Sequence, residues 1–516
     1  MATAPQPTSH LRAAALIAAS TYVTTVLGFV VSIIIARSLG PHDYGQYAYL
    51  VWLSGLLITI GNHGLGVSGI RFISECTGRG EIEEAKNVHR WLRKQQFLSV
   101  VGVLILFAIF ATFFKPAGWM GSTSMLLVII AVSVSCKAFY MFNISIAKGY
   151  KKFSIESWSN MIMSTAYTAG AGILALLHAS LNSFALFFSA ISAAYMLLAR
   201  YFFHKEQIRP GMANCSTDTL SRLKPHLLWT VVLVVVAALS NKTMETLLLS
   251  SLTGPAEVGY FSIATALTRG GVDLLSSALT TLLMPLMSHA YGEGGIRKVD
   301  EILSRAIRYF TFMGLLLAGV GLLWSEPGIL MMYGHKYEPV VNVLRVMTLI
   351  GGLTLTEGAF GALLSTTDNQ KLWAQISIMS IFVSVVMSAS LVPLYGLQGA
   401  VMSHAITRLA ILALMMWRIR KNMHEIHLPI KAMTKLALAA VLAGAAIAPL
   451  LLWQHTPVME FVCGTLFAIV YIPMSFWLGA WSAADLADLQ PLLNRLPGRA
   501  RLMAQRLTVA LHKQGN

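Results

Sequence analysis

The stretch that decides the fold is Gly-Pro-His-Asp-Tyr-Gly at residues 40–45, which returns as Gly-Pro-Ala-Glu-Val-Gly at residues 254–259. Each copy is a short turn between two long apolar stretches. The same offset relates Gly-x-Gly-x-Ile at residues 78–82 to Gly-x-Gly-x-Ile at residues 292–296. Two matched motifs at one offset indicate two copies of one membrane unit. Duplicated units are typical of transporters that bind substrate between their halves.

The composition is that of a membrane protein. The chain is 56% hydrophobic and 12% charged, against about 25% charged in an ordinary soluble domain. A chain of 516 residues this apolar needs the bilayer as its solvent. The net charge of +16 is typical of the positive-inside bias of membrane proteins. We therefore expect membrane lipids, and no nucleic acid, among its partners.

The apolar stretches predict an all-α polytopic membrane protein with about 14 transmembrane helices, each near the 20 residues that span a bilayer. With the amino terminus placed inside, most of the 38 lysines and arginines fall on the inner side. This alternation predicts a multi-pass protein of the cell inner (plasma) membrane with both termini cytoplasmic. The basic tail at residues 481–516 is expected to lie on the inner leaflet.

Several motifs of enzymes are absent from the sequence. There is no Gly-x-x-x-x-Gly-Lys-Ser/Thr loop for ATP phosphates and no Asp-x-Asp pair. His424 and His427 are three residues apart, whereas the zinc signature needs four. The four cysteines have no zinc-like spacing. We therefore expect no catalytic residue, no metal, no cofactor and no enzymatic activity.

Charged residues inside the predicted spans are the candidates for function, because each costs several kcal/mol in contact with hydrocarbon. Five bases and three acids qualify: Lys137, Lys242, Arg269, Arg345 and Arg408, with Glu245, Asp273 and Glu357. Arg269 and Asp273 are four residues apart, and Lys242 and Glu245 are three apart, so each pair shares a helix face. Each pair is either a structural ion pair or part of a binding site. Arg345 either lines the site or reaches the outer surface.

The sequence around the first turn resembles a known family. Ala-Arg-Ser-Leu-Gly-Pro-His-Asp-Tyr-Gly-Gln-Tyr at residues 36–47 is similar to the start of the Wzx-type polysaccharide flippases. These belong to the multidrug/oligosaccharidyl-lipid/polysaccharide (MOP) exporter superfamily. A basic loop with Arg71-Phe72 and Gly78-Arg79-Gly80 follows at the position that the family leads one to expect.

The resemblance implies a flippase for an undecaprenyl-diphosphate-linked oligosaccharide, a repeat unit of surface polysaccharide such as O-antigen or exopolysaccharide. It implies a first lobe at residues 1–203, a second lobe at residues 204–418, and two additional helices at residues 419–480. The five bases would then line a cationic cavity for the diphosphate, with Lys137, Lys242, Arg269 and Arg408 preferred. The three acids would serve ion coupling or charge balance. A polysaccharide polymerase and chain-length components are the expected protein partners.

Three other functions stay open at this point. A multidrug antiporter of the same superfamily shares the duplicated lobes, but cationic drugs favour an acidic cavity. A lipid II flippase also has a cationic cavity. A membrane-embedded polysaccharide polymerase usually needs a large outer loop, whereas the outer connections predicted for this chain are short.

Overall fold

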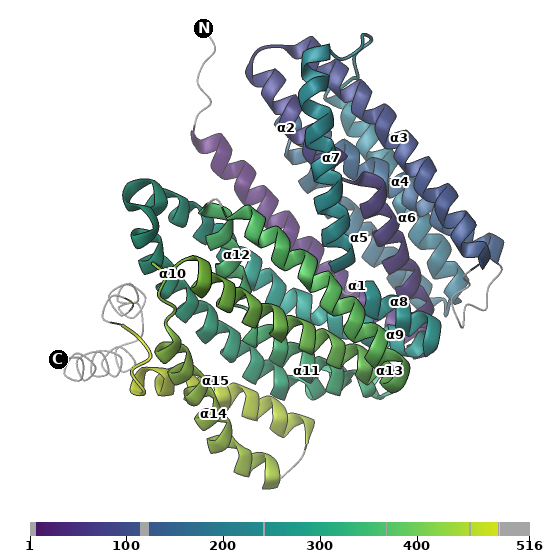
Figure 1. Cartoon of the computed structure of the whole chain (residues 1–516). Coiled ribbons are helices and arrows are strands. Elements are labelled where there is room, and N and C mark those ends of the chain that lie inside the picture. The colour runs from purple at the N-terminus through teal and green to yellow at the C-terminus, as the bar shows by residue number, and fades with distance from the viewer. Residues whose placement is uncertain are drawn as a thin grey trace. The chain divides into compact units, whose positions relative to one another are not determined.

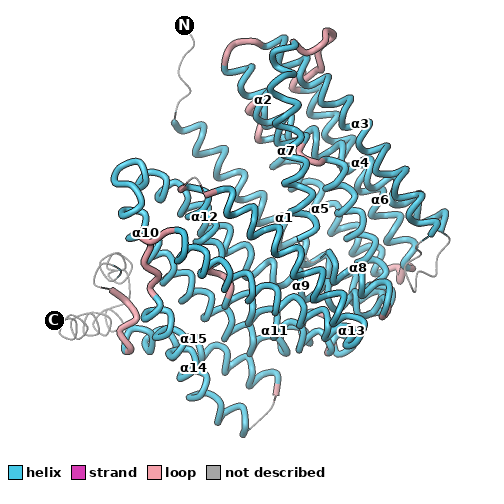
Figure 2. The backbone as a smooth tube through the Cα atoms, in the orientation of Figure 1, coloured by secondary structure: helices cyan, strands magenta, loops and turns pink. Residues whose placement is uncertain are grey.

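The computed structural model describes residues 7–113, 123–240, 243–367, 369–453, 456–482 and 485. All regular structure in these ranges is helical, as Figure 2 shows. The side chains of some residues in α1, α3, α4, α7 and α8 are also outside the description. The predicted all-α class is confirmed.

The chain divides into two compact units. Unit 1 comprises residues 1–262 with residues 392–397, and unit 2 comprises residues 263–391 and 398–516. The lobe boundaries predicted at residues 203 and 418 stay a prediction.

Unit 1 is a bundle of helices in which α1 packs on α5, and α4 packs on both α2 and α6. Figure 1 shows α3, α4 and α6 running side by side. Its helices are α1 (Pro7–Asn62), α2 (Leu65–Gly78), α3 (Ile82–Phe113), α4 (Thr123–Gly149), α5 (Ser154–Leu176), α6 (Leu181–Lys205), α7 (Thr217–Ser240), α8 (Thr243–Leu252) and the first part of α9 (Pro255–Thr268).

Unit 2 is built around α10, which packs on α11, α12, α14 and α15. The hairpin of α14 and α15 is the yellow-green part of Figure 1. After the end of α9 comes one π-turn (Arg269–Asp273), followed by α10 (Leu274–Met332), a 3-10 turn (His335–Tyr337), α11 (Pro339–Leu353), α12 (Glu357–Thr366), α13 (Gln370–Asn422), α14 (Ile430–Trp453) and α15 (Pro457–Trp477).

Glycine breaks reconcile these helices with the predicted spans. Within the described residues, 9 helical stretches are long and apolar enough to cross a membrane. Non-helical backbone at Gly40, at Gly294-Gly295 and at Gly396 interrupts three of them, and each break separates two predicted spans. The remaining predicted spans correspond to α5 and to α7 with α8. The chain is therefore a multi-pass membrane protein.

The two copies of the Gly-Pro turn contact each other inside unit 1. Pro41 and Pro255 each begin a helical segment, where the missing N–H costs nothing. A methyl group added at Gly45 would overlap the carbonyl group of Pro255. One added at Gly259, the matching glycine of the second copy, would lie 3.1 Å from the Cα of Gly45. The backbones of α1 and α9 meet here because both positions are glycine.

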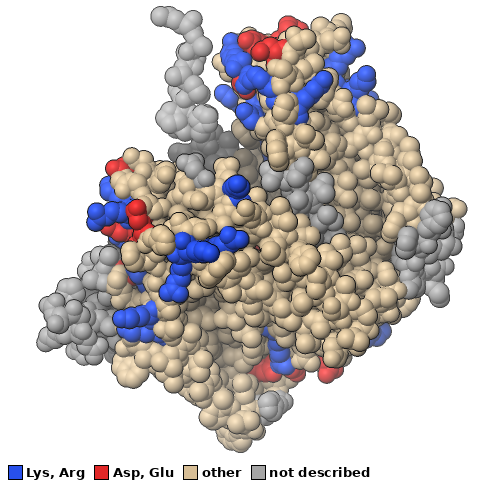
Figure 3. Space-filling model, viewed as in Figure 1, with Lys and Arg blue, Asp and Glu red and all other residues tan. Residues whose placement is uncertain are grey.

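Charge distribution agrees with the membrane assignment. On the face drawn in Figure 3, lysines, arginines and acids gather over the ends of α2 and α3, while the faces of the helices carry few charges. Exposed large apolar side chains occur on most of the helices, among them Leu106 on α3, Leu197 on α6 and Val441 on α14. These are the groups that face lipid in a membrane protein.

The last described residue, Asp485, is held against α10. Arg308 donates from Nε and Nη2 to the two carboxylate oxygens of Asp485, at 2.7 and 3.0 Å. Ser482 adds bonds from its N–H and its hydroxyl group. The basic tail predicted at residues 481–516 lies outside the described residues beyond this point.

Candidate functional site

In unit 1, the predicted site residue Lys137 is a half-buried residue on α4. Its Nζ lies 2.9 Å from the ring centroid of Tyr195 and 4.7 Å from that of Tyr140. No ion pair or hydrogen bond joins this ammonium group to another side chain in the described part of the chain. Two aromatic faces, and no carboxylate, therefore surround it.

Three helices hold the aromatic rings in place. Tyr140 follows Lys137 by three residues on α4, and Tyr195 comes from α6. Ser133 of α4 and Ser189 of α6 are hydrogen-bonded at 2.9 Å in the buried contact between the two helices. The hydroxyl group of Tyr140 donates to Oδ1 of Asn160 on α5 at 2.8 Å. The ring positions are therefore determined by packing and hydrogen bonding.

Two more tyrosines lie in the interior of unit 1. The hydroxyl groups of Tyr47 on α1 and Tyr167 on α5 are hydrogen-bonded to each other. The ring of Tyr167 lies 5.7 Å from that of Phe187 on α6. We name Tyr47, Tyr140, Tyr167 and Tyr195 the tyrosine cluster. This cluster could not be predicted from the sequence, because tyrosines inside apolar helices give no periodic signal that separates a functional role from packing.

Unit 2 pairs Arg408 with Glu357. Nη1 of Arg408 on α13 lies 2.8 Å from Oε2 of Glu357, the first residue of α12. The second oxygen, Oε1, is buried and accepts no hydrogen bond from any described residue. A helix amino terminus favours a negative charge at this position. The side chain of Arg408 is 35% exposed, and that of Glu357 is 15% exposed.

A break in the predicted tenth span places Glu357 at a helix start. The span, predicted at residues 339–365, is divided between α11 and α12 by residues 354–356. The hydroxyl group of Thr354 donates to the carbonyl of Ile350, a side-chain bond that competes with continued helix. Next to Glu357, a methyl group at Gly358 would lie 2.6 Å from Oγ of Ser276 on α10. This close packing brings Glu357 within electrostatic range of Asp273, one turn before Ser276.

Arg269 and Asp273 begin and end the π-turn between α9 and α10. The i→i+5 bonds of a π-turn change the register of side chains relative to an α-helix, and such turns are frequent at functional sites. Arg269 is exposed and Asp273 is half-buried. The spacing of Arg269 and Asp273 allowed either a structural ion pair or part of a binding site. The described ion pairs do not include one between these two residues.

Arg345 lies in an ion-pair network within unit 2. Its Nη2 contacts Oε1 of Glu460 on α15 at 2.6 Å and Oε2 of Glu326 on α10 at 3.1 Å. Its Nε donates to the carbonyl of Leu322 at 3.3 Å. Two carboxylates thus compensate this guanidinium and join α10, α11 and α15. Its assignment to the substrate-binding set stays a prediction.

The remaining two predicted residues lie near the start of α8. Lys242 is outside the described residues, so its pairing with Glu245 stays untested. Glu245 is buried, with 1% of its surface exposed. Glu245 lies in the first turn of α8.

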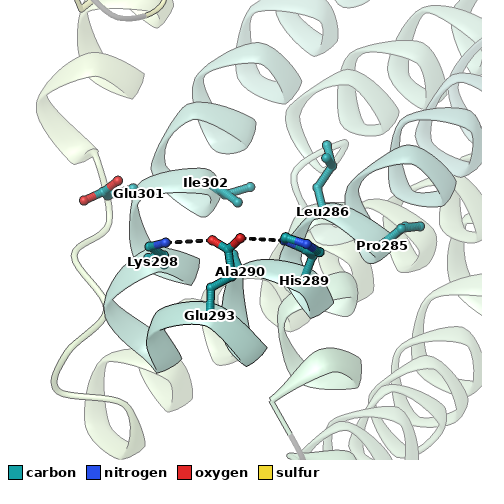
Figure 4. A pocket seen from close by; sticks show the side chains of 8 residues that line it. All are labelled: Pro285, Leu286, His289, Ala290, Glu293, Lys298, Glu301 and Ile302. Atoms are coloured by element: carbon teal, nitrogen blue, oxygen red, sulfur yellow. Dashed lines mark hydrogen bonds and ion pairs between the residues drawn. The ribbon is translucent and has the colours of Figure 1, made fainter.

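One pocket in unit 2 lies away from all predicted residues. It has a volume of about 530 Å³ and surrounds the glycine break of α10. Figure 4 shows Glu293 between His289 and Lys298, with ion-pair distances of 3.3 and 2.7 Å. Its lining residues are Pro285, Leu286, His289, Ala290, Glu293, Lys298, Glu301 and Ile302. Because Glu293 compensates both bases, the pocket has no excess of positive charge for an anion.

Comparison with known proteins identifies the family. Residues 10–291 match the family model described as polysaccharide biosynthesis protein. The chain is 23% identical over 195 residues to the capsular polysaccharide biosynthesis protein CapF of Staphylococcus aureus. That alignment covers 37% of this chain and 48% of CapF, so the chain matches about half the length of this curated relative.

Solved structures show the same fold. The structure of the lipid II flippase MurJ in an inward closed conformation aligns with a TM-score of 0.68 at 16% identity, covering 90% of this chain and 99% of MurJ. An inward-facing multidrug resistance MATE family transporter of the MOP superfamily aligns with a TM-score of 0.64 at 15% identity, covering 77% and 94%. At these identities the likeness establishes the fold alone.

The family model covers more than half of the 516 residues, and the sequence around the first Gly-Pro turn resembles the same group of proteins. The helices also follow the fold seen in the structures of MurJ and of the MATE family transporter. The chain belongs to the polysaccharide biosynthesis protein family.

Proposed function

We propose that this protein is a flippase that moves an undecaprenyl-diphosphate-linked oligosaccharide, the repeat unit of a surface polysaccharide, from the inner to the outer leaflet. The observation that carries the proposal is the environment of Lys137. A cation held inside a membrane helix bundle without a carboxylate partner attracts an anionic group. The diphosphate of the lipid-linked substrate supplies such a group and forms strong charge-assisted hydrogen bonds with an ammonium.

The charge of this site disfavours a drug exporter. A cationic drug gains energy from an unpaired carboxylate, whereas Lys137 repels a cation and its ammonium group already occupies the ring faces of its two tyrosines. A transporter also accounts for the family membership without any catalytic group. Export by alternating access, the inner-membrane location and the cytoplasmic placement of both termini belong to the same proposal. So do functional contacts with a polymerase and chain-length components.

We assign the charged residues of unit 2 a second role in the same proposal. Arg408 is already compensated by Glu357, and Asp273 adds a second acid within electrostatic range. This group can exchange its internal ion pair for a contact with substrate or with a coupling ion. Glu357 and Asp273 therefore remain the candidates for ion coupling or charge balance, while Lys137 is the primary anion contact.

Deletion of the gene tests the function directly. We expect undecaprenyl-diphosphate-linked repeat units to accumulate on the inner leaflet and the surface polysaccharide to disappear. A plasmid copy should restore export, whereas a Lys137→Ala copy at equal protein level should not. Lys148→Ala is the matched control, because Lys148 lies on the same helix but is paired with Glu156 at 2.8 Å. Normal surface polysaccharide in the deletion strain, together with changed drug resistance, would reject the proposal.

A further inference from the structure

The way in which Lys137 is held in unit 1 carries an inference beyond its charge. Three half-buried arginines of unit 2 have carboxylate partners: Arg308 has Asp485, Arg345 has Glu326 and Glu460, and Arg408 has Glu357. Lys137 instead contacts the rings of Tyr140 and Tyr195. A ring face attracts a cation without accepting a directed hydrogen bond of the strength that a carboxylate would.

The two rings form a fixed support. Their centroids are 4.6 Å apart at an interplanar angle of 58°, so they present two inclined surfaces to the ammonium group. Tyr140 is 4% exposed and Tyr195 is 9% exposed. The bond from Tyr140 to Asn160 fixes the first ring to α5. A lysine side chain has four flexible carbons, and this support restricts where its ammonium group can lie.

We propose that Tyr140 and Tyr195 are positioning residues, which hold the ammonium group of Lys137 ready for the diphosphate of the substrate by contacts through their ring faces. The proposal rests on the proposed function. An ammonium group has three N–H donors, and ring contacts leave donors available for phosphate oxygens. A carboxylate in the same place would compete with the phosphate. The aromatic support thus holds the lysine without using up its hydrogen-bonding capacity.

Binding of two defined lipids to the purified full-length protein in detergent tests this inference. The probes are undecaprenyl diphosphate and the uncharged undecaprenol, titrated separately. The wild-type protein should prefer the diphosphate, and Lys137→Met should reduce diphosphate affinity by about 10- to 100-fold, the range expected for charge-assisted bonds. Tyr195→Leu should reduce it about three- to tenfold, as expected for a lost cation–π contact. None of these changes should alter binding of undecaprenol.

Matched variants separate positioning from general packing. Tyr195→Phe and Tyr140→Phe keep the ring face, and both Phe and Tyr rings bind cations. The diphosphate affinity of each of these variants should therefore stay within about twofold of the wild-type value. Tyr201→Leu is the control on the same helix, because Tyr201 is 61% exposed. It should bind both lipids as wild type does. Gel filtration of each variant identifies any that fails to fold. If a leucine variant fails to fold, the diphosphate affinities of the phenylalanine variants are compared with that of wild type instead.

A double-mutant cycle gives the decisive measurement. If Tyr195 acts through Lys137, Tyr195→Leu should have no further effect on diphosphate affinity in the Lys137→Met protein. An equal loss in both backgrounds would overturn the inference, and so would wild-type affinity in Tyr195→Leu, while the proposed function would stand. A wild-type protein that binds undecaprenol as tightly as undecaprenyl diphosphate would overturn both.

Discussion

The contact between the two copies of the Gly-Pro turn allows a sharp prediction about Gly45. A Cβ atom at this position would overlap the carbonyl group of Pro255, which is backbone and cannot rotate away. To reach a normal separation of about 3.5 Å, α9 would have to move by about 1–2 Å relative to α1. Overpacking of this kind costs about 1–3 kcal/mol or more. We therefore expect Gly45→Ala to destabilise the protein.

Two other glycines calibrate the effect. A Cβ atom at Gly259 would lie 3.1 Å from the nearest atoms, Gly45 Cα and the Pro41 carbonyl oxygen, so Gly259→Ala should cost less. Gly55, on the same long helix as Gly45, has nothing within 4 Å of its added Cβ. Alanine there should stabilise the helix by about 0.5–1 kcal/mol, because glycine is the poorer helix former.

Thermal unfolding of the purified variants in detergent micelles measures this order. The unfolding midpoint should rise from Gly45→Ala through Gly259→Ala and wild type to Gly55→Ala. The sign of the Gly55→Ala change distinguishes steric overlap from a general intolerance of substitutions in α1. If Gly45→Ala unfolded at or above the wild-type midpoint, the contact between the two turns would not exist in the folded protein.

Two further predictions concern ion pairs. Arg408→Met leaves Glu357 without its partner and should lower the free energy of unfolding by about 1–3 kcal/mol, less than for a fully buried pair because Arg408 is 35% exposed. The double variant with Glu357→Leu should recover that stability in the same unfolding assay without recovering export, and failure to recover it would show that the two residues are not coupled. At Asp485, burial alone would raise the carboxyl pKa, but hydrogen bonds from Arg308 and Ser482 outweigh burial and hold that pKa below its usual range. A carboxyl group whose pKa is lower in the folded protein than in the unfolded chain stabilises the folded protein at any pH above its unfolded-state pKa of about 4. This contribution is lost as the pH falls through the folded-state pKa. Asp485→Asn should therefore unfold at a lower temperature than wild type at pH 7, and the difference should shrink below about pH 4; a constant difference would contradict this.

Much of the site could be named from the sequence, but its contacts could not. Lys137, Arg408 and Glu357 were candidates because a charge inside a 20-residue apolar span is costly wherever it lies. The partner of each charge depends on which helices pack together. Arg408 of α13 pairs with Glu357 of α12, and Arg345 of α11 pairs with Glu460 of α15. The partners are far apart in the sequence, so local spacing cannot predict these ion pairs.

Local spacing also misled in one respect. The four-residue interval between Arg269 and Asp273 favours contact on a regular α-helix, yet these residues begin and end a π-turn and form no ion pair with each other. Gly-Gly at residues 270–271 was the only local sign of irregular backbone. The tyrosine cluster gave no signal at all, since a tyrosine in an apolar helix is compatible with packing, with lipid contact or with a site.

The sequence by itself determined that the protein is a helical, multi-pass membrane protein with duplicated Gly-Pro turns, because the length of apolar runs and the backbone freedom of glycine and proline are local properties. The tertiary structure alone decided that the turns touch at Gly45 and Gly259. It also decided that Lys137 is supported by the rings of Tyr140 and Tyr195 while Arg408 is paired with an acid. The physical reason is that a charge in a low-dielectric interior is compensated by the groups within a few ångströms of it. Helix packing determines which groups those are, and no single segment of the sequence determines helix packing.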